Sequence, residues 1–169
     1  MKRRAVAVVL LSSISVLPVQ AQGDIPSTRA TLRGLPGVYV SVDSISADAR
    51  SDGLFASQIQ TDVELRLREA GIRVLTFDEA GATRGSGSLW VEVSTVHPLQ
   101  ALYGYSIGLN FTQGVRLERN GLYTAAATWS ALGVLGTVDG GRLSETVRKS
   151  VRDLVDQFIN AYLSVNPRR

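Results

Sequence analysis

Few side chains in this sequence have the types and spacing that catalysis or metal binding requires. The single histidine, His97, precedes Pro98, and the chain has neither a G-x-S-x-G motif nor a cysteine nucleophile for it to activate. We therefore interpret His97 as a turn residue at a strand end and not as a general base. Asp43, Asp48 and Asp52 lack the spacing of an EF-hand loop, which favours a solvated acidic connection over a calcium site.

The other acidic residues do not form a recognisable catalytic pair. Asp153 and Asp156 lie close in the sequence to basic residues on the same predicted helix, which predicts surface ion pairs. Glu92 and Glu118 have no second carboxylate at a defined distance, as a glycosidase would need. The sequence therefore predicts no catalytic residue, no cofactor and no metal site.

A glycine-rich segment, DEAGATRGSGS at residues 78–88, superficially resembles a phosphate-binding loop. Such a loop leads into a helix and carries a lysine, whereas the strand pattern LWVEVSTV follows here and no lysine is nearby. We therefore predict that residues 78–88 form a connecting loop.

The first 21 residues have the three parts of a secretory signal peptide. Three basic residues precede an apolar run over residues 5–17, and small side chains at Val19 and Ala21 are placed for cleavage before Gln22. This run of 13 residues contains three serines, whereas a membrane span needs about 20 apolar residues. We predict export to the periplasm or the medium, with no membrane span in the mature chain.

Removal of residues 1–21 also changes the charge of the chain. Three of the 18 basic residues are lost with them, so the remaining 148 of 169 residues carry 15 basic and 15 acidic side chains. A nucleic-acid-binding protein would keep a basic surface, so nucleic acid is not an expected partner. Because cysteine is absent, we expect neither a disulfide nor a cysteine-linked lipid anchor, and the fold must rest on its core.

The rest of the chain divides into an irregular leader segment at residues 22–36, a single domain at 37–165 and a tail at 166–169. The leader contains two prolines and little periodicity. The domain is long enough to bury a core of its own.

The first half of the domain has a strand–helix–strand pattern. Alternating valines predict a strand at residues 38–42, and Ser57 with Gln60 predicts a helix that begins with a capping box. Gly71 is expected to end that helix before a strand at residues 72–77. Such a unit is typical of a crossover between parallel strands.

The second half centres on the stretch YSIGLNFTQGVRLE, residues 105–118, whose apolar and polar side chains alternate as in one long strand. A three-residue loop at 119–121 would set Phe111 opposite Trp129 and keep apolar side chains on one face, whereas a two-residue turn would mix the faces. We therefore predict a type I turn with Gly121 left-handed in a bulge.

A helical apolar stripe over residues 144–163 predicts a long closing helix. On the sheet face that it would cover, the small side chains of Ala125, Ala127 and Ala131 would admit it closely, whereas a lipid-facing strand has no reason to be so small. The predicted fold class is α+β: a two-layer sandwich of an about five-stranded mixed sheet, in the order β-α-β-β-β-β-α with a long hairpin at 103–138, and two helices on one face.

The same register predicts an apolar patch on the sheet face opposite the helices. Its glycines would leave the surface low, and its leucines and valines would line it, as on surfaces that bind a partner or ligand. The expected occupant is either the leader, through Ile25, Leu32 and Leu35, or an envelope protein or apolar ligand. The predicted patch consists of Leu102, Gly104, Gly108, Leu132, Val134, Gly136 and Val138.

The predicted element order resembles that of small envelope domains, among them the N-terminal domain of the Tol-system translocation protein and the lipopolysaccharide-assembly lipoprotein. The phrases QTDVELRLREAGI and VDQFINAYLSVNP are also similar to those of uncharacterised exported bacterial proteins. These resemblances imply a place in the cell envelope and assign no functional residue. The sequence thus favours a non-enzymatic binding or envelope-assembly module; the alternatives are a secreted enzyme with an unrecognised site and a small outer-membrane β-barrel, which would need at least eight strands.

Overall fold

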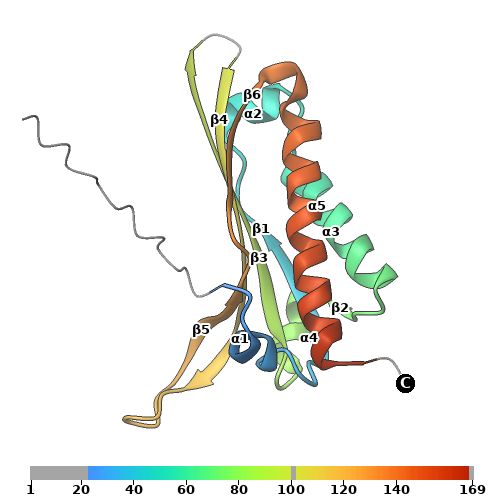
Figure 1. The fold of residues 1–169 in the computed structure, drawn as a ribbon, viewed down its shortest axis with the longest axis vertical. Coiled ribbons are helices and arrows are strands. Elements are labelled where there is room, and N and C mark those ends of the chain that lie inside the picture. Colours follow the sequence, from blue (N-terminus) through green and yellow to red (C-terminus); the bar gives the residue numbers. More distant parts are fainter. Residues whose placement is uncertain (1–22, 100–101, 168–169) are drawn as a thin grey trace, which may run out of the picture.

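The sheet of this protein has six strands that run in mixed directions (Figure 1). The computed structural model describes residues 23–99 and 102–167, so the predicted signal peptide lies outside the described residues. The strand order is β2-β1-β3-β4-β5, and β6 also pairs with β4. The strands are β1 (Val38–Val42), β2 (Val74–Leu75), β3 (Gly87–Leu99), β4 (Leu102–Arg116), β5 (Tyr123–Ser130) and β6 (Val134–Asp139).

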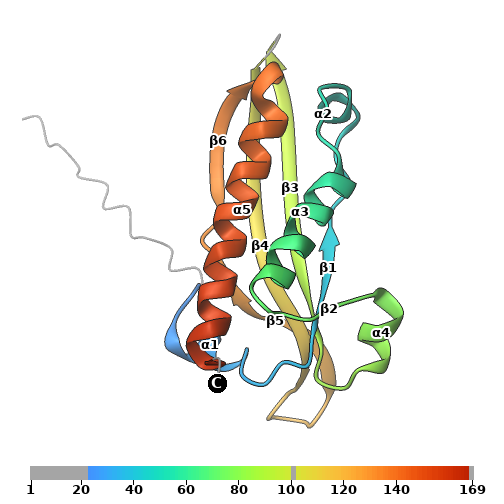
Figure 2. The ribbon, with the colours of Figure 1, turned by 90° about the vertical axis from the view of Figure 1, so that its right-hand side faces the viewer.

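Two long helices cover one face of this sheet, which confirms the predicted two-layer α+β class (Figure 2). Helix α5 runs along β4 and β6, whereas α3 packs against β1 and against α5. We call the face that α3 and α5 cover the inner face, and the opposite one the outer face. The helices are α1 (Pro26–Ala30), α2 (Ala47–Ser51), α3 (Ala56–Glu69), α4 (Phe77–Ala82) and α5 (Gly140–Val165).

The core lies between the inner face and these two helices. As predicted, Leu89, Val91 and Val93 of β3 all point into it. At its centre the ring of Phe158 from α5 lies 5.5 Å from that of Phe111 and 5.2 Å from that of Trp129, measured between centroids. Phe158 is fully buried, as the sequence pattern of the closing helix predicts.

Two predicted surface carboxylates form ion pairs on these helices. The Arg66 guanidinium of α3 lies 2.7 Å from the Asp156 carboxylate of α5. The Lys149 ammonium lies 3.3 Å from the Asp153 carboxylate. All four side chains are at least 40% exposed, so these pairs add little to stability.

The predicted crossover between parallel strands is present, but its details differ from the prediction. Strands β1 and β2 are parallel, with Val38 opposite Val74. Helix α3 has Phe55 as its N-cap without a side-chain cap bond, so the predicted capping box at Ser57 is wrong. Gly71 has a φ of +77°, as expected of a residue that ends a helix.

The predicted strand at residues 72–77 and loop at 78–88 are interrupted by α4. The Thr76 hydroxyl accepts the Glu79 N–H at 3.2 Å, and the Glu79 carboxylate accepts the Thr76 N–H at 2.8 Å. This capping box starts a helix at Phe77 and limits β2 to two residues. The loop prediction therefore holds only for residues 83–86.

The hairpin of β4 and β5 follows the predicted register only at the end away from its loop. Phe111 does lie opposite Trp129, but a bulge then places Thr112 opposite Ala127, one residue away from the prediction. At the other end, Leu117 donates its N–H to Leu122 at 2.8 Å across a four-residue loop instead of the predicted three. The longer loop and the bulge in β5 are two parts of the same shift.

Gly121 has a φ of +68°, so its predicted left-handed conformation is confirmed. Beyond the bulge the hairpin extends past the ends of α5 and α3 (Figure 1). The bulge also moves Ala125 and Ala127 to the outer face, opposite Gly114 and Thr112, so both are exposed and the prediction that α5 covers them is wrong. Ala131 is buried.

A second shift separates β5 from β6. The sequence register sets Tyr105 opposite Leu135, whereas in the structure Tyr105 lies opposite Gly136 and Leu135 lies opposite Ser106. The connection at residues 131–133 takes up the extra residue. Each side chain of β6 consequently points to the face opposite the predicted one.

The leader segment belongs to the main core. Leu32 is fully buried and Leu35 packs against the same cluster, whereas Ile25 is half exposed. The Asn166 side chain accepts the Gly34 N–H at 2.7 Å and donates to the Leu32 carbonyl at 2.9 Å. The prediction that the leader covers the outer face is therefore wrong.

Candidate functional site

Neither α3 nor α5 covers the outer face of the sheet, and this face exposes large apolar side chains. Four residues whose strand positions or neighbouring pairings put them there are strongly exposed: Trp90 at 40%, Val96 at 63%, Leu132 at 74% and Leu135 at 85%. Polar groups lie among them, since Asn110 donates to Glu92 at 3.0 Å. The outer face is thus a mixed surface with an apolar share.

Three of the predicted patch residues lie along this outer face in β4, namely Leu102, Gly104 and Gly108. Gly104 lies opposite Val96, and a Cβ built on Gly104 would come within 3.0 Å of the Val96 side chain. Gly108 lies opposite Glu92, whose carboxylate would be 3.1 Å from an added Cβ. Both neighbouring side chains therefore lean over the glycines.

The structure does not bring the rest of the predicted patch together. Leu132 is exposed in the connection between β5 and β6, but Val134 and Val138 pack against the core on the inner face. Gly136 lies beneath the ring of Tyr105, also on the inner face. The register shift before β6 is the cause of this difference.

The same shift brings to the outer face a residue that the sequence interpretation had assigned to the inner one. Leu135 lies opposite Ser106, the outer-face neighbour of Gly104 and Gly108 in β4. We define the apolar strip as the low residues Gly104, Ser106 and Gly108 of β4 together with the exposed Val96, Leu132 and Leu135 that flank them.

The acidic and aromatic residues near His97 form a structural contact on the other side of the sheet. His97 lies within β3 and not in a turn, and its ring stacks on Tyr103 at 4.3 Å. The Tyr103 hydroxyl donates to Asp52 at 2.6 Å. This hydrogen bond, together with burial, raises the pKa of Tyr103 to about 12, so the phenol stays protonated at neutral pH.

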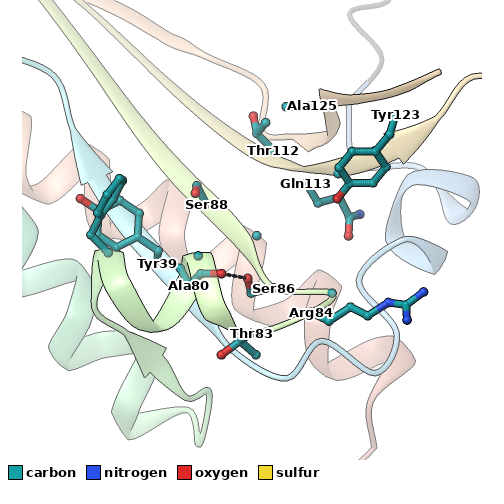
Figure 3. A pocket seen from close by; sticks show the side chains of 15 residues that line it. Tyr39, Ala80, Thr83, Arg84, Ser86, Ser88, Thr112, Gln113, Tyr123 and Ala125 are labelled. Atoms are coloured by element: carbon teal, nitrogen blue, oxygen red, sulfur yellow. Dashed lines mark hydrogen bonds between the residues drawn. The ribbon is translucent and has the colours of Figure 1, made fainter.

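A hollow of about 390 Å³ lies at the end of the outer face where β3 begins and β4 ends (Figure 3). Three neighbouring strands form its floor from small residues at outer-face positions: Ser88 of β3, Thr112 and Gly114 of β4, and Ala125 of β5. The loop at residues 83–86, together with Gly87 at the start of β3, closes one end. We call this site the base hollow.

Aromatic rings form two walls of the base hollow. On one side Phe77 of α4 meets Tyr39 of β1 edge to face, with 5.7 Å between ring centroids. On the other side the Tyr123 ring lies over Gly114, where any Cβ would collide with it. Phe77 is 73% exposed and Tyr123 is 70% exposed, so both rings offer surface to a ligand.

The polar groups of the base hollow are mostly hydroxyls without a partner. The Ser86 hydroxyl donates to the Ala80 carbonyl at 2.8 Å (Figure 3). In contrast, the hydroxyls of Tyr39, Ser88, Thr112 and Tyr123 have no hydrogen-bond partner within residues 23–99 and 102–167. Among the described residues that line the hollow, Arg84 alone has a charged side chain.

The sequence interpretation missed the base hollow because two of its parts were assigned wrongly. The wall at Phe77 depends on α4, whose signal was the spacing of Thr76 and Glu79. The floor depends on the shifted pairing that sets Gly114 opposite Ala125. Within the described residues no group of histidine or carboxylate side chains could hold a metal ion, and no helix is long and apolar enough to cross a membrane.

Comparison with known proteins finds solved structures of partly similar layout. No family model and no curated protein matches the chain. A PelC dodecamer from Paraburkholderia phytofirmans is 17% identical and covers 73% of this chain and 87% of that one, with a TM-score of 0.44. A minor lipoprotein from Acinetobacter baumannii is 11% identical and covers 77% and 92%, with a TM-score of 0.39. Similarity at this level carries no functional argument, and the resemblance to the Tol-system and lipopolysaccharide-assembly domains stays a prediction.

Proposed function

We propose that this chain is an exported, non-enzymatic binding module of the cell envelope that holds a partner on the outer face of its sheet. The observation that carries the proposal is the apolar strip, because Leu132 and Leu135 are 74% and 85% exposed on a face that neither α3 nor α5 covers. The signal-peptide pattern supports the exported location.

The shape of the apolar strip supports a binding role. Val96 of β3 and Leu135 of β6 are separated by β4, and adjacent strands lie about 4.8 Å apart. Since β4 contributes only Gly104, Ser106 and Gly108 between them, the surface there is low, and a partner laid along β4 can contact Val96 and Leu135 together. Complete burial of one leucine side chain contributes about 1.5–3 kcal/mol, so a few such contacts favour association.

The partner that this surface suits best is an envelope protein that lays an apolar segment along β4. The strip is shallow and extends over three strands, whereas a small apolar ligand prefers an enclosed cavity. The glycines keep the strip shallow, and the flanking leucines supply the contacts that a complementary apolar segment would bury.

Site-specific photo-crosslinking in cells that export the protein tests this proposal. Leu135 is replaced by p-benzoylphenylalanine, and Leu65, which is 54% exposed on α3, serves as the matched control on the opposite layer. We expect illumination to give a discrete protein adduct from position 135 and none from position 65. No discrete adduct from position 135, or the same adduct from both positions, would contradict the proposal.

A further inference from the structure

The base hollow is a second feature of the outer face, distinct from the apolar strip. Its volume of about 390 Å³ falls in the range of about 300–1,000 Å³ that is typical of small-molecule sites. Its two walls belong to different parts of the chain, since Phe77 comes from α4 and Tyr123 from the hairpin. These two residues are far apart in the sequence, so only the folded chain brings the two walls together.

The walls indicate a ligand with ring-shaped apolar faces. The face of an aromatic ring carries partial negative charge and attracts the slightly positive C–H groups of a saturated ring that stacks on it. Phe77 and Tyr123 are both at least 70% exposed, although the domain has an ample core in which large apolar side chains could be buried.

The floor indicates that the same ligand carries hydroxyl groups. The hydroxyls of Ser88 and Thr112 lie between the aromatic walls without a partner among the described residues. Each can donate one hydrogen bond and accept others. A purely apolar ligand would remove these groups from water without replacing their hydrogen bonds, which is unfavourable.

The charges disfavour two other ligand classes. The described lining contains no carboxylate, so a cationic ligand would find no counter-charge there. Arg84 alone is a weak match for a phosphate group, which binding sites usually surround with several donors of positive or backbone origin. A ring that is neutral, or that carries a single carboxylate within reach of Arg84, agrees with the lining.

We propose that the base hollow binds a saccharide whose sugar rings stack between Phe77 and Tyr123 and hydrogen-bond to the hydroxyls of Ser88 and Thr112. This inference rests on the proposed binding function and names a ligand class for the outer face. Because the hollow is open to solvent on the side opposite its floor, an internal stretch of a longer glycan can lie in it with both ends free.

The test is binding of the mature chain, residues 22–169, to an array of neutral and uronic-acid-containing bacterial glycans, followed by calorimetric titration of those that bind. We expect Phe77→Ala and Tyr123→Ala each to weaken binding at least about tenfold, because each removes a stacking surface. Thr112→Val keeps the side-chain shape and should weaken binding by about threefold to tenfold through the lost hydrogen bond.

Two further variants make the result specific. Leu122→Ala changes an exposed side chain next to Tyr123 at the loop and should leave glycan binding unchanged. Arg84→Gln separates the two saccharide classes, since it should weaken only the binding of uronic acids. Denaturation curves of all variants check that each is folded.

The inference is overturned if no glycan on the array binds, or if the wall variants bind as well as the unaltered chain. These outcomes are separate from failure of the proposed function, because a protein adduct from position 135 depends on the apolar strip and not on the base hollow. Conversely, glycan binding without that adduct would leave a saccharide-binding protein whose outer strip has no partner.

Discussion

Replacement of Phe158 by alanine is the perturbation for which the structure gives the clearest magnitude. Phe158 is fully buried, and its ring packs against Phe111 at 5.5 Å and Trp129 at 5.2 Å. The loss combines the hydrophobic transfer of the ring, the cavity left between β4, β5 and α5, and two aromatic contacts of about 0.5–1.5 kcal/mol each. We expect Phe158→Ala to lower the free energy of unfolding by about 3–5 kcal/mol.

Urea denaturation of residues 22–169 measures this loss. Such a decrease is a large part of the roughly 5–15 kcal/mol by which a typical domain is stable. The urea concentration at the unfolding midpoint should therefore fall markedly, with little change in the dependence of the unfolding free energy on urea. Phe77→Ala is the matched control, because Phe77 is 73% exposed and its removal should cost less than about 1 kcal/mol. A loss below about 1 kcal/mol for Phe158→Ala would show that α5 does not pack on the sheet as described.

Two further predictions concern the hairpin loop and the leader. Gly121→Val should lower the free energy of unfolding by about 1–2 kcal/mol, because a φ of +68° strains a β-branched residue. Asn120→Ala, which removes only the hydrogen bond that the Asn120 side chain accepts from the Leu122 N–H, should cost less; equal losses in urea denaturation would contradict this. The hydrogen bond from the Arg29 guanidinium lowers the pKa of Asp24; burial opposes this effect, and the hydrogen bond from the Trp129 indole adds to it. The ionised form of Asp24 therefore stabilises the fold. Asp24→Asn should therefore destabilise the protein by on the order of 1 kcal/mol at pH 7, and this difference should shrink as the pH falls below about 4; a difference that persists at pH 2 would refute the linkage.

The elements with strong local signals could be predicted from the sequence. The alternation of Leu89, Val91 and Val93 identifies the buried face of β3, and the stripe through Phe158 identifies α5, because each pattern reports on side chains that face one core. Gly121 was predictable for another local reason, since a left-handed residue in a hairpin loop is usually glycine.

Features set by strand pairing could not be predicted in the same way. Matching of apolar faces gave the correct pair of Phe111 and Trp129, but it could not reveal a bulge immediately beyond that pair. One extra residue before β6 then exchanged the faces of Val134 and Leu135. Three of the seven predicted patch residues, Val134, Gly136 and Val138, lie on the inner face for this reason.

Helix α4 was predictable in principle. Thr76 and Glu79 have capping-box spacing, but the glycines that follow within residues 81–87 suggested a loop. The leader was harder, because Leu32 is a single apolar residue in an irregular segment, and only the contacts with Asn166 and the core explain its burial.

The most direct test of the central claim, that the outer face is the binding face, is cysteine accessibility in intact cells. The natural sequence has no cysteine, so Leu135→Cys and Leu65→Cys each introduce one defined thiol at an exposed position on opposite layers. In the purified protein both thiols should react with a soluble maleimide at similar rates. In exporting cells the account predicts that position 135 is protected at least about tenfold relative to position 65, as expected when a partner buries it. Equal reactivity of the two positions in cells would contradict the claim.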